Sequence, residues 1–223
     1  MSRPLTTKEK NAIDDMLAFI QKILKCDDKL GEPCNPERST IKMRPERVNE
    51  IRDILKGLRG LLDENKIDVG SRDESDKAST DSDGIHLNEN FGGDWTNWIT
   101  FPDDWELSDC NEGYFQSFWR LVEVLFHEYY HYVHHTGFLG TLNKAWQLVS
   151  FIPFAPVIKV TGIGPDTWAG FEYTTYYDTY FVLDALYDML SDICLCTENC
   201  IDCCDQNLQY LKEARKNQLA GTN

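Results

Sequence analysis

Histidine is scarce in this chain of 223 residues, yet four of its five histidines fall between positions 127 and 135. Within this cluster, the motif His127-Glu128-x-x-His131 places two imidazoles four residues apart. On an α-helix, residues at this spacing lie one turn apart on the same face, so both rings can bind one Zn²⁺ at about 2.0–2.1 Å. Glu128 would lie beside the metal and accept a proton from a metal-bound water, which is the chemistry of a zinc-dependent hydrolase.

The motif requires a helix, and residues 114–135 predict one. This segment contains no glycine or proline, and Gly137 follows it at the place where a glycine commonly ends a helix. Apolar residues nearly surround the helix, which predicts that it is buried. Imidazole and carboxylate groups without partners would destabilise a buried helix strongly, so a bound metal explains the motif better than stray polar residues do.

The remaining elements predict an α+β fold that is mostly helical, with a small sheet. Apolar residues recur at three- and four-residue spacing through much of the chain, and one short segment alternates. In chain order, the predicted elements are two helices within 7–69 with a break at 30–45, a strand at 84–91, the helix at 114–135, a buried helix from about 167, and a helix at about 202–219.

Composition divides the chain into three regions and excludes some partners. Residues 1–69 are an N-terminal helical region, 70–83 an acidic linker or loop, and 84–223 the main domain with a cysteine-rich C-terminal segment. The formal net charge of −15 argues against binding to nucleic acid or to anionic membranes. No apolar leader is visible, so a cytoplasmic protein is expected, with a secreted effector or a fragment of a larger protein as the alternative.

The motif on a buried helix resembles the active-site helix of zincin metallopeptidases. The histidines after it resemble small gluzincin-like proteins of the ImmA/IrrE kind, and residues 84–91 are similar in position to the zincin edge strand that pairs with a peptide. The resemblance covers about residues 84–195 and implies a zincin-like core with two buried active-site helices, a Zn²⁺ cofactor, and a peptide or protein substrate bound near Ile85–Asn90. The metzincin pattern is absent, because position 137 is glycine where that pattern needs histidine.

In gluzincins the third zinc ligand is a glutamate from a later helix, which implies Glu172 here. Its alternative role is a carboxylate stabilised by the dipole at a helix N-terminus. Asp178 is the next candidate, either as a ligand or as an acceptor for the outer nitrogen of a ligand histidine. His134 and His135 lie about 10–12 Å along the helix axis from His127, so they would join the same metal only if the helix unwound.

A tyrosine or histidine near the metal would stabilise the oxyanion of a tetrahedral intermediate. Tyr176 is the residue that we assign to this role, with packing as its alternative. His86, on the predicted strand, could face the cleft, although a lone exposed histidine is the simpler expectation. The other candidates for oxyanion stabilisation are Tyr173, Tyr177, His134 and His135.

Five of the eight cysteines fall between Cys194 and Cys204. The Cys200-x-x-Cys203 pair is compatible with a structural zinc site. Disulfides that also involve Cys26, Cys34 or Cys110 are a second interpretation, and buried thiols are a third. Without a visible signal peptide, thiols or metal-bound cysteines are favoured over disulfides.

The sequence therefore predicts a zinc-dependent metallopeptidase, with His127, His131 and Glu172 as metal ligands and Glu128 as general base. Two alternatives belong to other classes of protein. One is a non-catalytic zincin-like interaction module whose metal is structural, and the other is a cysteine-rich interaction protein that binds zinc through its C-terminal cluster.

Overall fold

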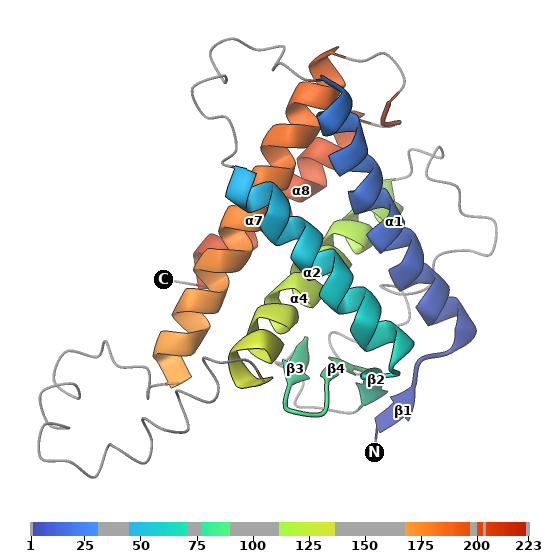
Figure 1. The fold of residues 1–223 in the computed structure, drawn as a ribbon, viewed down its shortest axis with the longest axis vertical. Coiled ribbons are helices and arrows are strands. Elements are labelled where there is room, and N and C mark those ends of the chain that lie inside the picture. Colours follow the sequence, from blue (N-terminus) through green and yellow to red (C-terminus); the bar gives the residue numbers. More distant parts are fainter. Residues whose placement is uncertain are drawn as a thin grey trace, which may run out of the picture.

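The computed structural model describes residues 2–30, 45–70, 77–89, 112–136, 168–196, 200–202 and 204–221. The elements in chain order are β1 (Ser2–Pro4), α1 (Thr7–Leu30), α2 (Pro45–Asp63), β2 (Ile67–Gly70), β3 (Ala78–Thr80), β4 (Ile85–Asn88), α4 (Glu112–Thr136), α7 (Trp168–Cys196) and α8 (Cys204–Gly221). The fold is α+β and mostly helical, as predicted, and its small sheet lies at one end of the helices (Figure 1). The predicted helices are confirmed, while the break expected at 31–44 lies outside the described residues.

The four strands form one mixed sheet in the order β1-β2-β4-β3. β2 and β4 are parallel, with Ile67 opposite Ile85, and the other two pairs are antiparallel. The strand predicted at 84–91 is confirmed as β4, but its assignment as an edge strand is wrong because β3 pairs with its outer side. Among the described strands, β3 is therefore the edge strand on this side of the sheet.

β3 lies inside the segment 70–83, which was predicted to be a linker or loop. That prediction is wrong for Ala78–Thr80, whose three residues are too few and too polar to show an alternating pattern. Pairing with β4 holds them extended, because Ala78 lies opposite Leu87 and Thr80 lies opposite Ile85. The cause is tertiary, since backbone hydrogen bonds to a buried strand override weak local preference.

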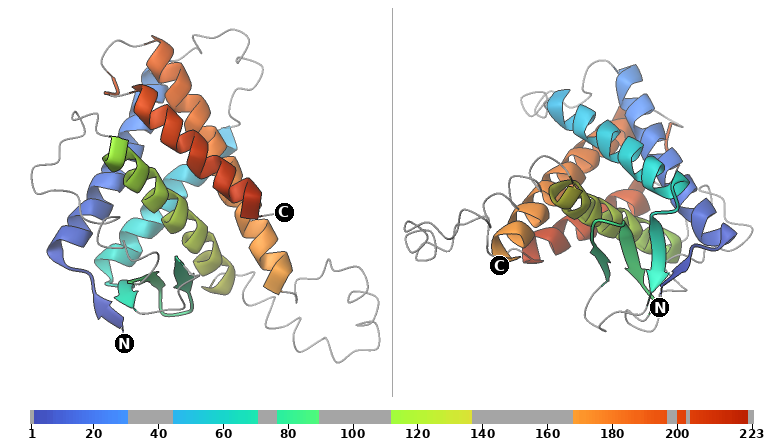
Figure 2. Two further views of the ribbon diagram at one scale, coloured as in Figure 1. Left: turned by 180° about the vertical axis from the view of Figure 1, so that it is seen from behind. Right: turned by 60° about the horizontal axis from the view of Figure 1, so that its bottom comes forward.

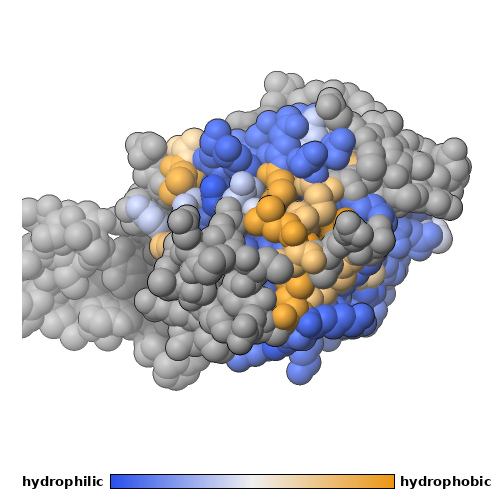
Figure 3. Space-filling view, turned by 90° about the horizontal axis from the view of Figure 1, so that it is seen from above, coloured by the Kyte–Doolittle hydropathy of each residue, from blue (hydrophilic) through white to orange (hydrophobic). Residues whose placement is uncertain are grey.

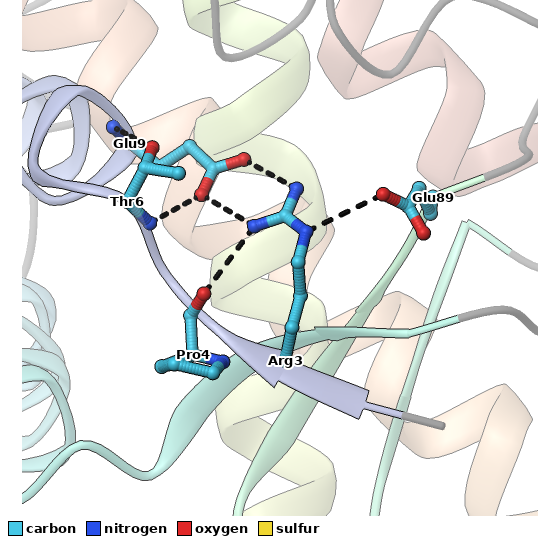
Figure 4. Close-up of polar contacts among 5 residues, drawn as sticks. All are labelled: Arg3, Pro4, Thr6, Glu9 and Glu89. Carbon is cyan, nitrogen blue, oxygen red and sulfur yellow. Dashed lines mark hydrogen bonds and ion pairs between the residues drawn. The ribbon is translucent and has the colours of Figure 1, made fainter.

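The start of α1 is tied to the sheet by a charged network (Figure 4). Thr6 and Glu9 form a capping box: the Glu9 amide donates to Thr6 Oγ1 at 3.3 Å, and the Thr6 amide donates to Glu9 Oε2 at 2.6 Å. Arg3 of β1 donates two hydrogen bonds of 2.9 Å to Glu9 and one of 3.3 Å to Glu89, just after β4. Burial raises the pKa of the Glu9 carboxyl, but the hydrogen bonds from Arg3 and Thr6 outweigh burial and lower it.

α4 lies at the centre of the fold and contacts β3 and β4 as well as α2, α7 and α8 (Figures 1 and 2). Its first half fills the core with aromatic rings, and Phe118 packs edge-to-face on Phe19 of α1 with ring centroids 5.2 Å apart. α2 approaches α4 closely at Gly57, where an added Cβ would overlap the phenol of Tyr129. Glycine at this position therefore makes room for an aromatic ring of the motif.

α8 runs back along α7 in the opposite direction and also packs on α4 (Figure 2). Trp119 of α4 donates a hydrogen bond of 3.0 Å from its indole Nε1 to Asn207 Oδ1, and both side chains are buried. The Asn207 amide in turn donates to the Asp202 carbonyl oxygen at 3.1 Å. These contacts fix the position of α8 along α4, which matters for the residues nearer its C-terminal end.

Disulfides close the end of the molecule at which α7 ends and α8 begins. Cys26 of α1 is bonded to Cys200, and Cys194 of α7 is bonded to Cys204 of α8. Cys196 is also disulfide-bonded, and the described residues include no free cysteine. The preference for thiols or metal-bound cysteines is therefore wrong here, and a Cys200-x-x-Cys203 zinc site is excluded because Cys200 is not a thiolate.

Figure 3 shows this end of the molecule, where apolar side chains gather between polar ones. Leu195, in the last turn of α7, is 67% exposed.

Among the described residues, no helix is long and apolar enough to cross a membrane.

Removing the Cys26–Cys200 disulfide is expected to destabilise the protein more than removing Cys194–Cys204. The first disulfide spans 174 residues of sequence and the second spans 10, so loop-closure entropy predicts losses of about 5 and about 3 kcal/mol. Guanidinium denaturation of the two double-alanine variants measures both losses in the free energy of unfolding. An equal or larger loss at Cys194–Cys204 would contradict this order.

Candidate metal centre

The two histidines of the motif converge on one point. His127 Nε2 and His131 Nε2 are 3.1 Å apart, and the ring centroids are 4.8 Å apart. Two nitrogens bound to one tetrahedral Zn²⁺ are separated by about 3.3–3.4 Å, so this pair fits a single metal ion with a shift of a few tenths of an ångström. Both side chains are buried on α4, as the sequence predicted.

Glu128 is also buried and is held by the edge strand. Thr80 of β3 donates a hydrogen bond of 2.7 Å from its hydroxyl to Glu128 Oε2. The same hydroxyl oxygen lies 3.1 Å from the Glu128 carbonyl oxygen. β3 thus fixes one oxygen of the carboxylate.

Tyr176 of α7 lies against the histidine pair. Its ring centroid is 4.5 Å from that of His127, with the two rings tilted by 51°. α7 therefore presents this face to the motif, and the structure brings the candidate tyrosine to the candidate metal ligand. The role of the Tyr176 hydroxyl in stabilising an oxyanion stays a prediction.

Two side chains that the sequence did not single out lie on the outer side of His127: Gln218 contacts its Nδ1, and Glu123 contacts Gln218. Gln218 Oε1 of α8 lies 3.2 Å from His127 Nδ1, and Gln218 Nε2 donates a hydrogen bond of 2.9 Å to Glu123 Oε1 of α4. No local pattern points to Gln218, which is 91 residues from His127 in sequence. Glu123 lies one turn before His127. The sequence could have indicated Glu123 as a site residue, because it is an acid on a helix that is otherwise nearly all apolar.

The third ligand is not among the residues brought together here. Within the described parts of the chain, no third His, Cys, Asp or Glu joins the pair to form a metal-binding group. Glu172 belongs to α7, but its side chain lies outside the described residues, as do the side chains of His134, His135 and Tyr173. These assignments stay predictions.

Asp178, the alternative ligand, is half-buried on α7 and faces charges on α2. Burial and the negative charge of Glu50 raise the pKa of the Asp178 carboxyl, while Arg47 lowers it. Glu50 accepts a hydrogen bond of 2.7 Å from the Tyr130 hydroxyl, and burial together with this bond raises the pKa of Tyr130. The side-chain oxygen that lies against the outer nitrogen of His127, at 3.2 Å, belongs to Gln218.

His86 is not a lone exposed histidine, so that expectation is wrong. Its side chain is 12% exposed, with Nδ1 2.8 Å from Asp68 Oδ1 and Nε2 3.0 Å from Asp81 Oδ1. Asp68 is its cross-strand neighbour on β2, and Asp81 follows β3. Burial lowers the pKa of the imidazole, but the two carboxylates outweigh burial and raise it above its ordinary value.

No protein-family model, curated protein or solved structure matches this chain. The residues and their geometry therefore carry the functional argument alone.

Stability is expected to fall with rising pH through the His86 ion pairs. Because the pKa of His86 is raised in the folded protein, its contribution is complete below the unfolded pKa of about 6.5 and is lost as pH rises through the folded pKa. The measurement is the free energy of unfolding of wild type minus that of His86→Asn between pH 5.5 and 9. A difference that stays constant or grows with pH would contradict the expectation.

Proposed function

We propose that the chain is a zinc-dependent peptidase of the zincin type, in which His127 and His131 bind the metal and Glu128 is the general base. The observation that carries the proposal is the 3.1 Å separation of the two Nε2 atoms on a buried helix. Buried imidazoles whose nitrogens point at each other are costly unless they share a proton or a metal ion. The carboxylate next to the pair gives the site a proton acceptor as well.

The proposed chemistry depends on the two histidines as metal ligands and on the Glu128 carboxylate beside them. Zn²⁺ bound by the two histidines would act as a Lewis acid and acidify a water molecule at the site. Glu128 then accepts a proton through the oxygen that Thr80 does not hold. The same carboxylate can deliver that proton to the leaving amine when a peptide bond is cleaved.

Glu172 is our candidate for the third ligand. It precedes Tyr176 by one helical turn on α7 and so shares its helix face. Because the ring of Tyr176 packs on His127, this face of α7 is the one turned toward the metal ligands. Tyr176 would serve as the group that stabilises the oxyanion.

A peptide substrate would lie along β3 and not along Ile85–Asn90. β4 is paired on both sides, whereas no described strand pairs with the outer edge of β3. An extended peptide can add to such an edge through backbone hydrogen bonds. Thr80, on this edge, holds Glu128, so a peptide bound there would pass close to the general base.

The disulfides bear on the compartment in which this reaction would occur. Disulfides persist in oxidising compartments and are rare in the cytosol. Cys26–Cys200 and Cys194–Cys204 therefore favour an oxidising compartment over the cytoplasmic location expected from the sequence.

Glu128→Gln is expected to keep zinc and to lose peptide cleavage by about 10²–10⁴-fold, the usual contribution of a general base. The measurements are metal content by elemental analysis and cleavage of a peptide library by mass spectrometry. His127→Ala is the matched control and should lose the zinc. A wild-type protein that holds zinc at His127 and His131 but cleaves no peptide would support a non-catalytic module instead.

Glu172→Ala is expected to weaken zinc binding more than Asp178→Ala does. Loss of an outer hydrogen-bond partner typically costs 10–100-fold in affinity, roughly, so Asp178→Ala should cost no more than that, while loss of a ligand should cost more. Competition with a chromophoric chelator measures both affinities. A larger loss for Asp178→Ala would make Asp178 the ligand and refute the assignment of Glu172.

A further inference from the structure

The C-terminal helix contributes a buried amide to the motif helix. Gln218 is 4% exposed and contacts both His127 and Glu123 of α4. The distances are 3.2 Å from Gln218 Oε1 to His127 Nδ1 and 2.9 Å from Gln218 Nε2 to Glu123 Oε1. The amide therefore connects a carboxylate to the outer nitrogen of a candidate metal ligand.

Glu123 determines which way this amide points. A carboxylate only accepts hydrogen bonds, so it requires the NH₂ group of Gln218 on its side. The opposite orientation would bring the amide oxygen against the carboxylate, in a place where neither could be solvated, because Glu123 is 1% exposed. The carbonyl oxygen of Gln218 must then face His127.

The amide orientation in turn determines the tautomer of His127. A carbonyl oxygen only accepts, so Nδ1 of His127 must carry the proton and donate it to Gln218. A neutral imidazole protonated at Nδ1 has its lone pair at Nε2, which is the nitrogen that faces His131 at 3.1 Å. That tautomer is the one able to bind a metal through Nε2.

Further contacts hold Glu123 in place. Asn217, the neighbour of Gln218 on α8, donates to Glu123 Oε2 at 3.3 Å. The ammonium of Lys77, at the start of the described segment before β3, lies 3.7 Å from Glu123 Oε1. Asn217 and Lys77 are both donors, so each of them also faces the carboxylate of Glu123 as an acceptor.

We propose that Glu123 and Gln218 are positioning residues that fix His127 as its Nδ1–H tautomer and thereby prepare the site for metal. The role of this tautomer in zinc binding rests on the proposed function, but the tautomer itself does not. Helix α8, outside the part of the chain that resembles a zincin, is then part of the metal centre. We call Glu123 and Gln218 the tautomer relay.

The first test uses the metal-free full chain with ¹⁵N-labelled histidine at a pH at which imidazole is neutral. Long-range ¹H–¹⁵N correlation spectra distinguish the two tautomers, and His127→Gln assigns the signal. Wild type is expected to show the Nδ1–H form, and Gln218→Met, which is close in size, should show a mixture or the Nε2–H form. An unchanged Nδ1–H signal in a folded Gln218→Met protein would overturn the proposal.

The second test exchanges the two side chains. Gln218→Glu alone brings two buried carboxylates together and should reduce both stability and zinc affinity. The double change Glu123→Gln with Gln218→Glu restores a donor facing an acceptor, so it should recover the Nδ1–H tautomer and most of the zinc affinity. If the double variant has native circular dichroism but recovers neither the Nδ1–H tautomer nor the zinc affinity, the relay is contradicted. If Gln218→Met does not fold, the double variant alone tests the relay.

Zinc affinity separates the relay from the peptidase proposal. Gln218→Met is expected to weaken zinc binding by about 10–100-fold, as loss of an outer partner usually does, with Gln209→Met, exposed on the same helix, as the matched control. A tautomer change without any zinc binding in wild type would refute the metal site and leave the relay standing. Zinc binding that is equal in wild type and Gln218→Met would refute the role of the relay in metal binding and leave the metal site standing.

Discussion

The constraint on which the rest of this structure depends is the burial of polar groups on a helix that is otherwise apolar. α4 carries Glu123, His127, Glu128 and His131 inside the protein. A buried polar group costs free energy unless it has a hydrogen-bond partner, and a buried charge costs more. Each of these groups therefore demands a neighbour, and for Glu123, His127 and Glu128 the neighbours come from elements that are distant in sequence.

This demand accounts for the arrangement around α4. β3 supplies the hydroxyl of Thr80 to Glu128, and α8 supplies the amide of Gln218 to Glu123 and His127. α7 supplies the ring of Tyr176. The disulfide Cys194–Cys204 closes the connection between α7 and α8, and the Trp119–Asn207 hydrogen bond fixes α8 along α4. The sheet edge and the C-terminal helix are thus parts of the site and not only of the scaffold.

The sequence predicted those features that depend on local pattern. The helices with long apolar faces were predicted correctly, and so was the convergence of His127 and His131 on one helix face, because helical geometry fixes both. β3 escaped prediction because Ala78–Thr80 is short and polar, and its pairing with β4 is a tertiary effect. The two disulfides and the Asp68–His86–Asp81 contacts also depend on which distant segments meet, and no spacing in the sequence encodes that.

The same distinction limits what the motif alone implies about chemistry. The spacing of His127 and His131 places two rings on one helix face, but it does not say which nitrogen of His127 carries the proton. That choice depends on the acceptor at Nδ1, and the acceptor is 91 residues away in sequence. A chain with the same motif but an apolar residue in place of Gln218 would keep the two rings and lose control of the lone pair. If the motif binds zinc as proposed, its ability to do so therefore depends on the last helix, because a metal ligand is defined by its protonation state as well as by its position.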